Sequence, residues 1–250
     1  MTVYQAVALL AAGVGGGIAG TMASVASVVS YPALLALGLP PLAANVTNTM
    51  SLVFCVPGAV LGARPELSGQ RSRVLRFGAV MAAGGALGAA VLLLAPPGAF
   101  AMAVPVLIGS AAVLVLLQPK LRALHPRPGA EQSRRRLAVV LAVAIYLGYF
   151  GAAGGVLLLA ALAATLSEPL IRVNAIKNVI AGAANLVAAL IFAFYAPVDW
   201  AFVAPLAAGF LIGGYAGQRL ARHLPVALLR VIVALAGLGL AVKLGISAYA

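Results

Sequence analysis

The stretch Val173-Asn174-Ala175-Ile176-Lys177-Asn178 places two amides and one ammonium group at the start of a segment that continues Val179-Ile180-Ala181-Gly182. A similar polar cluster, Ala44-Asn45-Val46-Thr47-Asn48-Thr49, opens an apolar segment in the first half of the chain. A lysine at the centre of a membrane helix costs about 2.5–3.5 kcal/mol on insertion scales. Something near Lys177 must offset that cost, and an anion bound in a water-filled cavity is one candidate.

The composition places the chain in a lipid bilayer. Of its 250 residues, 64% are hydrophobic and 8% are charged, whereas a soluble domain carries about 25% charged residues. Apolar stretches of about 20 residues, the length of a spanning helix, recur along most of the chain. Because lipid offers no hydrogen bonds to the backbone, these stretches predict an all-α, polytopic membrane protein.

The net charge of +12 does not indicate nucleic-acid binding, because the basic residues lie in short loops between apolar segments, where they set the orientation of the protein. Attraction to membrane lipid headgroups is a secondary effect of the same residues. Cys55 is the only cysteine, so neither a disulfide nor a cysteine metal cluster is expected. No cofactor is implied.

The order of the apolar segments predicts two similar halves. Residues 3–37 and 137–165 are each too long for one span and are interrupted by glycines, so each is predicted to form two short helices, about 3–20 and 22–37 in the first case. Three spans follow in the first half, at 43–61, 77–94 and 100–117. The predicted division is a first membrane repeat at 1–117, a basic cytoplasmic linker at 118–136 and a second membrane repeat at 137–250.

Short motifs recur in the same order in both halves. Gly148-x2-Gly151 matches Gly17-x2-Gly20, and Gly209-x3-Gly213 matches Gly84-x3-Gly88. Between them, either Asn174 aligns with Asn45 or Asn178 aligns with Asn48. The shared order predicts a duplicated architecture. The Gly-x3-Gly faces could pack within the protomer or between protomers, which leaves a homodimer open.

The basic loops indicate that the second half is inverted. Loops 62–76, 118–136 and 218–223 should all be cytoplasmic. With four spans per half, loop 218–223 would lie on the external side of the membrane. With five elements per half, all three basic loops lie on the cytoplasmic side and both termini lie on the external side. An odd number of crossings inverts the second half. We therefore expect an inverted repeat, each half having a glycine-broken first hairpin and three spanning helices. Many secondary transporters have this architecture, with a midplane site between the repeats.

The glycine-rich first segment, Tyr31-Pro32, the turn Gly38-Leu39-Pro40-Pro41, the Arg-rich loop and the repeat of the plan around Asn174–Asn178 together resemble the sulfite exporter TauE/SafE family. The resemblance covers essentially the full chain. It implies an exporter of sulfur-containing or organic anions, such as sulfite, sulfonate or sulfoacetate, in the bacterial cell inner membrane. Ser24, Ser27 and Ser30 stand where many members carry glycine and proline.

Amide and hydroxyl groups can donate hydrogen bonds to an oxyanion, and Lys177 can supply positive charge. The predicted substrate-binding residues are Asn45, Thr47, Asn48, Thr49, Asn174, Lys177, Asn178, Ser27 and Tyr31. The alternative roles are helix capping and hydrogen bonding between helices. Lys177 could instead extend to the cytoplasmic interface. Asn185 could extend the site or serve as a packing amide, and Glu168 is expected to pair with Arg172.

The function predicted first is a secondary anion transporter that works by alternating access. A passive channel or facilitator of the same fold is the main alternative. An intramembrane enzyme would need a His, Cys or carboxylate constellation in the membrane, but Glu66, Glu131, Glu168 and Asp199 fall in or near loops. A non-transporting assembly factor is a further alternative. No catalytic, cofactor-binding or metal-binding residue is predicted. The expected partners are a small anionic substrate and membrane lipid, with no nucleic acid.

Overall fold

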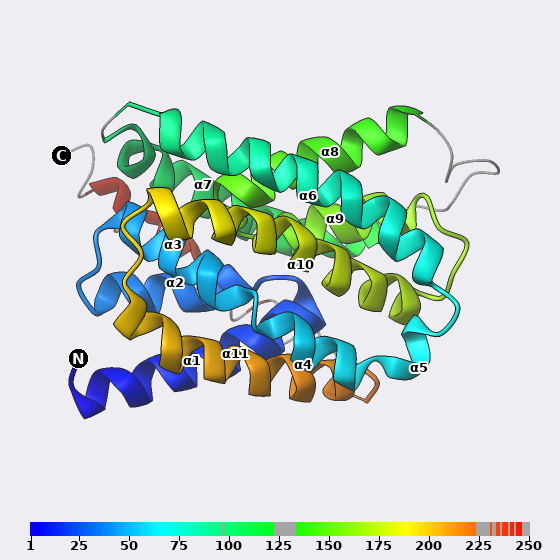
Figure 1. The fold of residues 1–250 in the computed structure, drawn as a ribbon, viewed down its shortest axis with the longest axis horizontal. Helices are drawn as coiled ribbons and strands as arrows, with labels where there is room; N and C mark the ends of the chain where they lie inside the picture. The colour runs from blue at the N-terminus through cyan, green and yellow to red at the C-terminus, as the bar shows by residue number, and fades with distance from the viewer. Residues whose placement is uncertain are drawn as a thin grey trace.

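The computed structural model describes residues 1–96, 98–122, 134–223 and some positions within 231–246, and in these ranges every regular element is a helix. The helices are α1 (Val3–Ala23), α2 (Ala26–Ala36), α3 (Pro41–Leu52), α4 (Cys55–Gly62), α5 (Arg64–Leu67), α6 (Arg71–Leu94), α7 (Ala99–Arg122), α8 (Arg134–Tyr149), α9 (Gly154–Ala163), α10 (Leu170–Tyr195) and α11 (Trp200–Leu220) (Figure 1).

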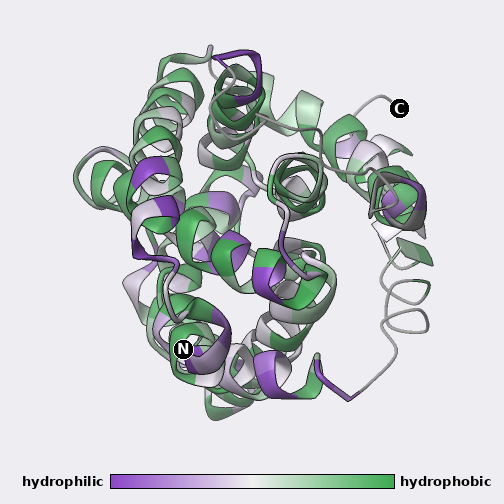
Figure 2. Ribbon diagram, turned by 90° about the vertical axis from the view of Figure 1, so that its right-hand side faces the viewer, coloured by the Kyte–Doolittle hydropathy of each residue, from purple (hydrophilic) through white to green (hydrophobic). Residues whose placement is uncertain are grey.

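Six helical segments are long and apolar enough to cross a membrane, with α3 and α4 counted together: Val3–Ala23, Pro41–Gly62, Arg71–Leu94, Ala99–Gln118, Leu170–Tyr195 and Trp200–Leu220. Figure 2 shows that their ribbons are mostly hydrophobic, with hydrophilic residues on short segments. The predicted all-α, polytopic membrane protein is therefore confirmed. Helices α7 and α8 extend into the predicted linker from both sides, and residues 123–133 lie outside the described part of the chain.

The first segment of each half is divided into two helices, as predicted, but in the first half the break lies later than the predicted helix end at residue 20. Helix α1 continues through Gly20 to Ala23 and ends at Ser24, which has a left-handed φ of 66°. In the second half the chain turns between α8 and α9, where Gly151 and Ala153 have φ values of 76° and 54°. The glycines inside α1 do not break it, because they serve helix packing.

A further break was not predicted. The expected span at 43–61 is divided into α3 and α4 around Val53 and Phe54. Pro57 in α4 explains this, because a proline has no N–H to donate to the carbonyl four residues before it and its ring collides with that carbonyl.

The glycine faces pack helices of one half against helices of the other. A methyl group added at Gly13 of α1 would fall 2.9 Å from the Cα of Gly209 of α11, and one at Gly17 would fall 2.8 Å from the Cα of Gly213. Likewise, a methyl group added at Gly88 of α6 would fall 2.9 Å from the backbone carbonyl carbon of Gly148 in α8. Both predicted Gly-x3-Gly faces are thus used within the protomer, so they no longer argue for a homodimer.

The two halves run in opposite directions where their first helices can be compared. In Figure 1, α1 begins at the left end of the molecule and α8 begins at the right end. Helix α5 and the first turns of α6, α8 and α10, all of which contain arginine, lie toward the right end, whereas the connection from α10 to α11 lies at the left. This arrangement is what an inverted repeat requires, and the repeat itself stays a prediction.

Candidate functional site

The two helix breaks, one from each half, meet inside the molecule. A methyl group added at Gly155, in the first turn of α9, would fall 3.0 Å from the carbonyl oxygen of Ser24 at the end of α1. A cavity of about 80 Å³ lies at this meeting point. Its polar lining comes from both halves: Thr21, Ser24, Ser27, Thr49, Lys177, Asn178 and Asn185.

Lys177 lines this cavity and is 2% exposed. Its Nζ donates to the Ser24 hydroxyl oxygen at 2.7 Å and to the Gly20 carbonyl at 3.3 Å. Both acceptors lie at the C-terminal end of α1, which carries the negative end of the helix dipole. The helix end therefore offsets part of the cost of burying the ammonium group. Lys177 does not extend to the membrane interface.

Two amides from other helices complete the end of α1. Asn174 Nδ2 donates to the Thr21 carbonyl at 2.8 Å, and Gln118 Nε2 donates to the Ala23 carbonyl at 3.0 Å. The last carbonyls of a helix have no partner within the helix, and lipid supplies none. These contacts explain how α1 can end buried inside the protein, away from water. The sequence-based division placed Gln118 in the linker. Its position directly after the apolar span 100–117 could have indicated a buried hydrogen-bond donor.

The second break is held in the same way. Asn45 Nδ2 of α3 donates to the carbonyl of Tyr149, the last residue of α8, at 3.0 Å. The Tyr146 hydroxyl donates to the Ala152 carbonyl at 2.7 Å. Asn45 and Asn174, which are paired in one of the two possible alignments of the halves, thus make equivalent hydrogen bonds in opposite halves. Neither of them lines the cavity.

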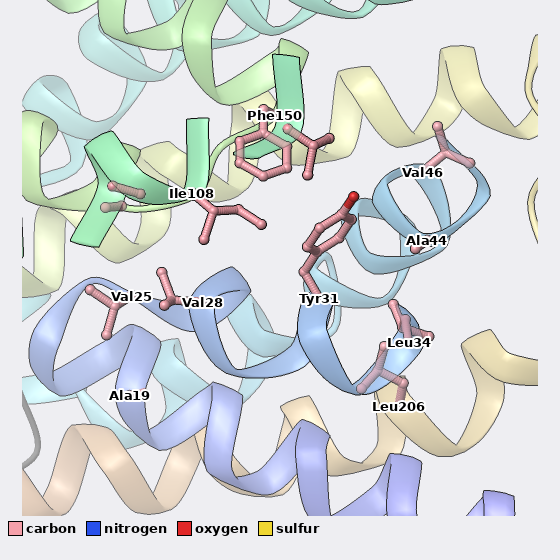
Figure 3. Packing of buried hydrophobic residues seen from close by; sticks show 14 of the residues in the cluster. Ala19, Val25, Val28, Tyr31, Leu34, Ala44, Val46, Ile108, Phe150 and Leu206 are labelled. Carbon is pink, nitrogen blue, oxygen red and sulfur yellow. The ribbon is translucent and has the colours of Figure 1, made fainter. Parts of the chain in front are cut away.

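Three other predicted site residues also lie outside the cavity lining. Asn48 accepts from the Ser30 hydroxyl at 2.6 Å and donates to the Ser27 hydroxyl oxygen at 3.1 Å. Thr47 accepts from the backbone N–H of Asp199, at the start of α11. Tyr31 lies in the apolar core beside Phe150, with its hydroxyl donating to the Pro41 carbonyl at 3.3 Å (Figure 3). Their predicted role in binding stays untested.

The remaining predicted residues line the cavity but already have protein partners. Asn178 Nδ2 donates to Gln218 Oε1 at 2.9 Å, and the Thr49 hydroxyl donates to the Asn45 carbonyl at 3.0 Å. Asn185 is different. It lines the cavity, and within the described part of the chain it makes no hydrogen bond. Its amide is therefore available to a bound molecule.

Two helix N-termini also face this space. Ala26 and Ser27 open α2, Gly155 is in the first turn of α9, and all three residues line the cavity. The first N–H groups of a helix have no partner within it and carry partial positive charge, so they favour anions. With the Lys177 ammonium, the arrangement is suited to holding a small anion.

Outside the membrane segments, two carboxylates are held by arginines. Glu168 pairs with Arg172 at 3.2 Å, as predicted, and also with Arg73 at 2.6 Å. Hydrogen bonds, first from Arg73 and then from Gln70, lower the pKa of Glu168. Hydrogen bonding from Arg222 lowers the pKa of Glu66 in the same way. Among the described residues, no group of three or more His, Cys, Asp or Glu side chains could hold a metal ion.

The model of one protein family, described as sulfite exporter TauE/SafE, matches residues 7–244. Comparison with curated proteins and with solved structures gave no match.

Proposed function

Since the chain belongs to the sulfite exporter TauE/SafE family, we propose that it is a secondary transporter, in the export direction, of small sulfur-containing or organic anions across the bacterial inner membrane. The observation that carries this proposal is the cavity at the meeting point of the two helix breaks. It combines a buried ammonium group, two helix N-termini and an unpartnered amide in a membrane-embedded site.

The size of the cavity favours a small substrate. Its volume of about 80 Å³ is several times the roughly 10–15 Å³ that one water needs by a comparable measure. It suits sulfite or sulfate, whereas sulfoacetate would require the cavity to widen.

The arrangement of the helices supports alternating access. Helix α1 packs on α11 and α8 packs on α6, so each broken helix is attached to the other half through close glycine contacts. The cavity lies between these two packed units. Rocking one against the other would expose the anion first to one side of the membrane and then to the other. The basic end would face the cytoplasm.

Reconstituted protein tests this function. Sulfite flux into liposomes should saturate and should be stimulated by sulfite preloaded on the opposite side, which a channel would not show. Lys177→Gln should reduce sulfite affinity about 10- to 100-fold, because a hydrogen bond to a charged group is worth about 1.5–3 kcal/mol. Lys120→Gln removes the charge of an exposed lysine and should leave flux unchanged. Equal sulfite flux in Lys177→Gln and wild type would show that the substrate does not bind in this cavity.

A further inference from the structure

A second pocket lies at the basic end of the molecule, away from the central cavity. It has a volume of about 420 Å³ and is lined by the end of α4, the start of α5, the last turns of α11 and Arg222 just after α11. Three arginines line it, namely Arg64, Arg219 and Arg222. None of these residues lines the central cavity.

Two of the three arginines of this pocket carry positive charge that no carboxylate of the described chain compensates. Arg222 is bound to Glu66, with Nε to Oε1 at 2.8 Å and Nη2 to Oε2 at 2.9 Å, so that pair is neutral. Arg64 and Arg219 have no carboxylate partner in the described part of the chain. Two net positive charges therefore face one pocket.

The pocket is also preorganised by contacts within the protein. The Arg222 guanidinium donates from Nη2 to the Gly62 carbonyl at 2.8 Å, which fixes the end of α4 to the end of α11. The Arg219 guanidinium lies over the Tyr215 ring, 4.7 Å from its centroid. This cation–π contact holds the side chain without neutralising its charge.

Apolar side chains continue from the pocket toward the middle of the membrane. Leu61 and Tyr215 line the pocket and are 49% and 38% exposed. One turn earlier on α11, Leu211 and Ile212 are 40% and 53% exposed. A ligand in this pocket would thus meet positive charge at the membrane surface and apolar surface below it.

We propose that this pocket binds the phosphodiester headgroup of an anionic phospholipid, with Arg64 and Arg219 contacting the phosphate and the acyl chains lying along α11. Basic pockets between membrane helices on the cytoplasmic side suit such headgroups. The apolar surface next to the arginines favours a lipid over free phosphate, because free phosphate has no acyl chain that could bind to this surface.

The test measures lipid binding by native mass spectrometry and thermal shift in detergent. The probes are short-chain phosphatidylglycerol, phosphatidylcholine and inorganic phosphate. The variants are Arg64→Gln/Arg219→Gln and, as a control matched in charge, Arg71→Gln/Arg134→Gln, whose arginines are exposed outside the pocket. The melting temperature without lipid checks that each variant is folded.

Wild type should bind phosphatidylglycerol in preference to phosphatidylcholine. The pocket variant should bind phosphatidylglycerol about 30-fold more weakly, since each basic residue near the surface contributes about fivefold, and the control should stay within about threefold of wild type. Equal losses in both variants would mean a general charge effect and would overturn the proposal. Displacement of phosphatidylglycerol by equimolar inorganic phosphate would assign the pocket to free phosphate and overturn it as well.

Discussion

Asn45 and Asn174 make equivalent hydrogen bonds in opposite halves of the molecule. Asn45 donates to the carbonyl of Tyr149 at the end of α8, and Asn174 donates to the carbonyl of Thr21 in the last turn of α1. Each amide closes the broken helix of the half to which it does not belong. The halves are therefore joined at the two points where these helices end inside the protein.

Replacing either asparagine should destabilise the protein. Asn45→Leu and Asn174→Leu each leave a buried carbonyl without its donor, which costs about 1–3 kcal/mol. The two variants should lose similar amounts in equilibrium unfolding in mixed micelles. Asn185→Leu serves as the control, because Asn185 makes no hydrogen bond within the described chain. A loss in Asn185→Leu as large as in the other two would contradict the capping role.

The same Asn185→Leu variant should weaken substrate binding. The unpartnered amide lines the same cavity as Lys177, and one hydrogen bond to an anion is worth about 1.5–3 kcal/mol. We expect the KM for sulfite flux to rise at least tenfold while the melting temperature without ligand stays near that of wild type. An unchanged KM would show that the anion does not reach this side of the cavity.

Two glycines of α6 should respond to alanine in opposite ways. At Gly85 the new methyl group would fall 2.7 Å from the Cα of Ala184 in α10, whereas at Gly78 it would meet nothing within 4 Å. Gly85→Ala should cost about 1–3 kcal/mol through overpacking. Gly78→Ala should be neutral or stabilising by up to about 1 kcal/mol, because alanine favours the helix. Thermal unfolding of both variants measures this, and equal effects would show that α6 and α10 are not in close contact.

The ion pair of Glu168 predicts a dependence of stability on pH. Arg73 lowers the pKa of Glu168 in the folded state, so the contribution is fully present above the unfolded value of about 4.3 and is lost as the pH falls through the lowered folded value. The melting temperature of wild type should therefore drop as the pH falls below about 4. The melting temperature of Glu168→Gln should drop less than that of wild type, and the melting temperature of the double variant Glu66→Gln/Glu168→Gln should drop least. Identical pH profiles for wild type and Glu168→Gln would contradict this role of the pair.

Several features could be predicted because they depend on residues close together in the sequence. The apolar lengths predicted the spans, and the over-long segments at 3–37 and 137–165 predicted the two broken hairpins. The Glu168–Arg172 pair is four residues apart on one helix end. The break in the first segment was predicted a few residues too early, since the glycines of α1 signalled close packing on α11 rather than a helix end.

The roles of the polar residues could not be separated in this way. Each of the clusters at 44–49 and 173–178 contains residues that bind the carbonyls of a helix end and residues that line the cavity. Both groups of residues have hydrogen-bond donors of the same kinds. Residue type alone did not distinguish Asn174, which is bound to a carbonyl of α1, from Asn178, which lines the cavity.

The sequence by itself determined that the chain is helical and that it lies in a membrane, because hydrophobicity and segment length are properties of the chain alone, and its motif order predicts that the two halves follow one plan. Only the tertiary structure decided which amides close helices and which side chains surround a cavity. The reason is that those partners come from the other half, as in the bonds that join residues 104 and 153 positions apart. A hydrogen-bonding group in lipid takes whichever partner packing brings to it.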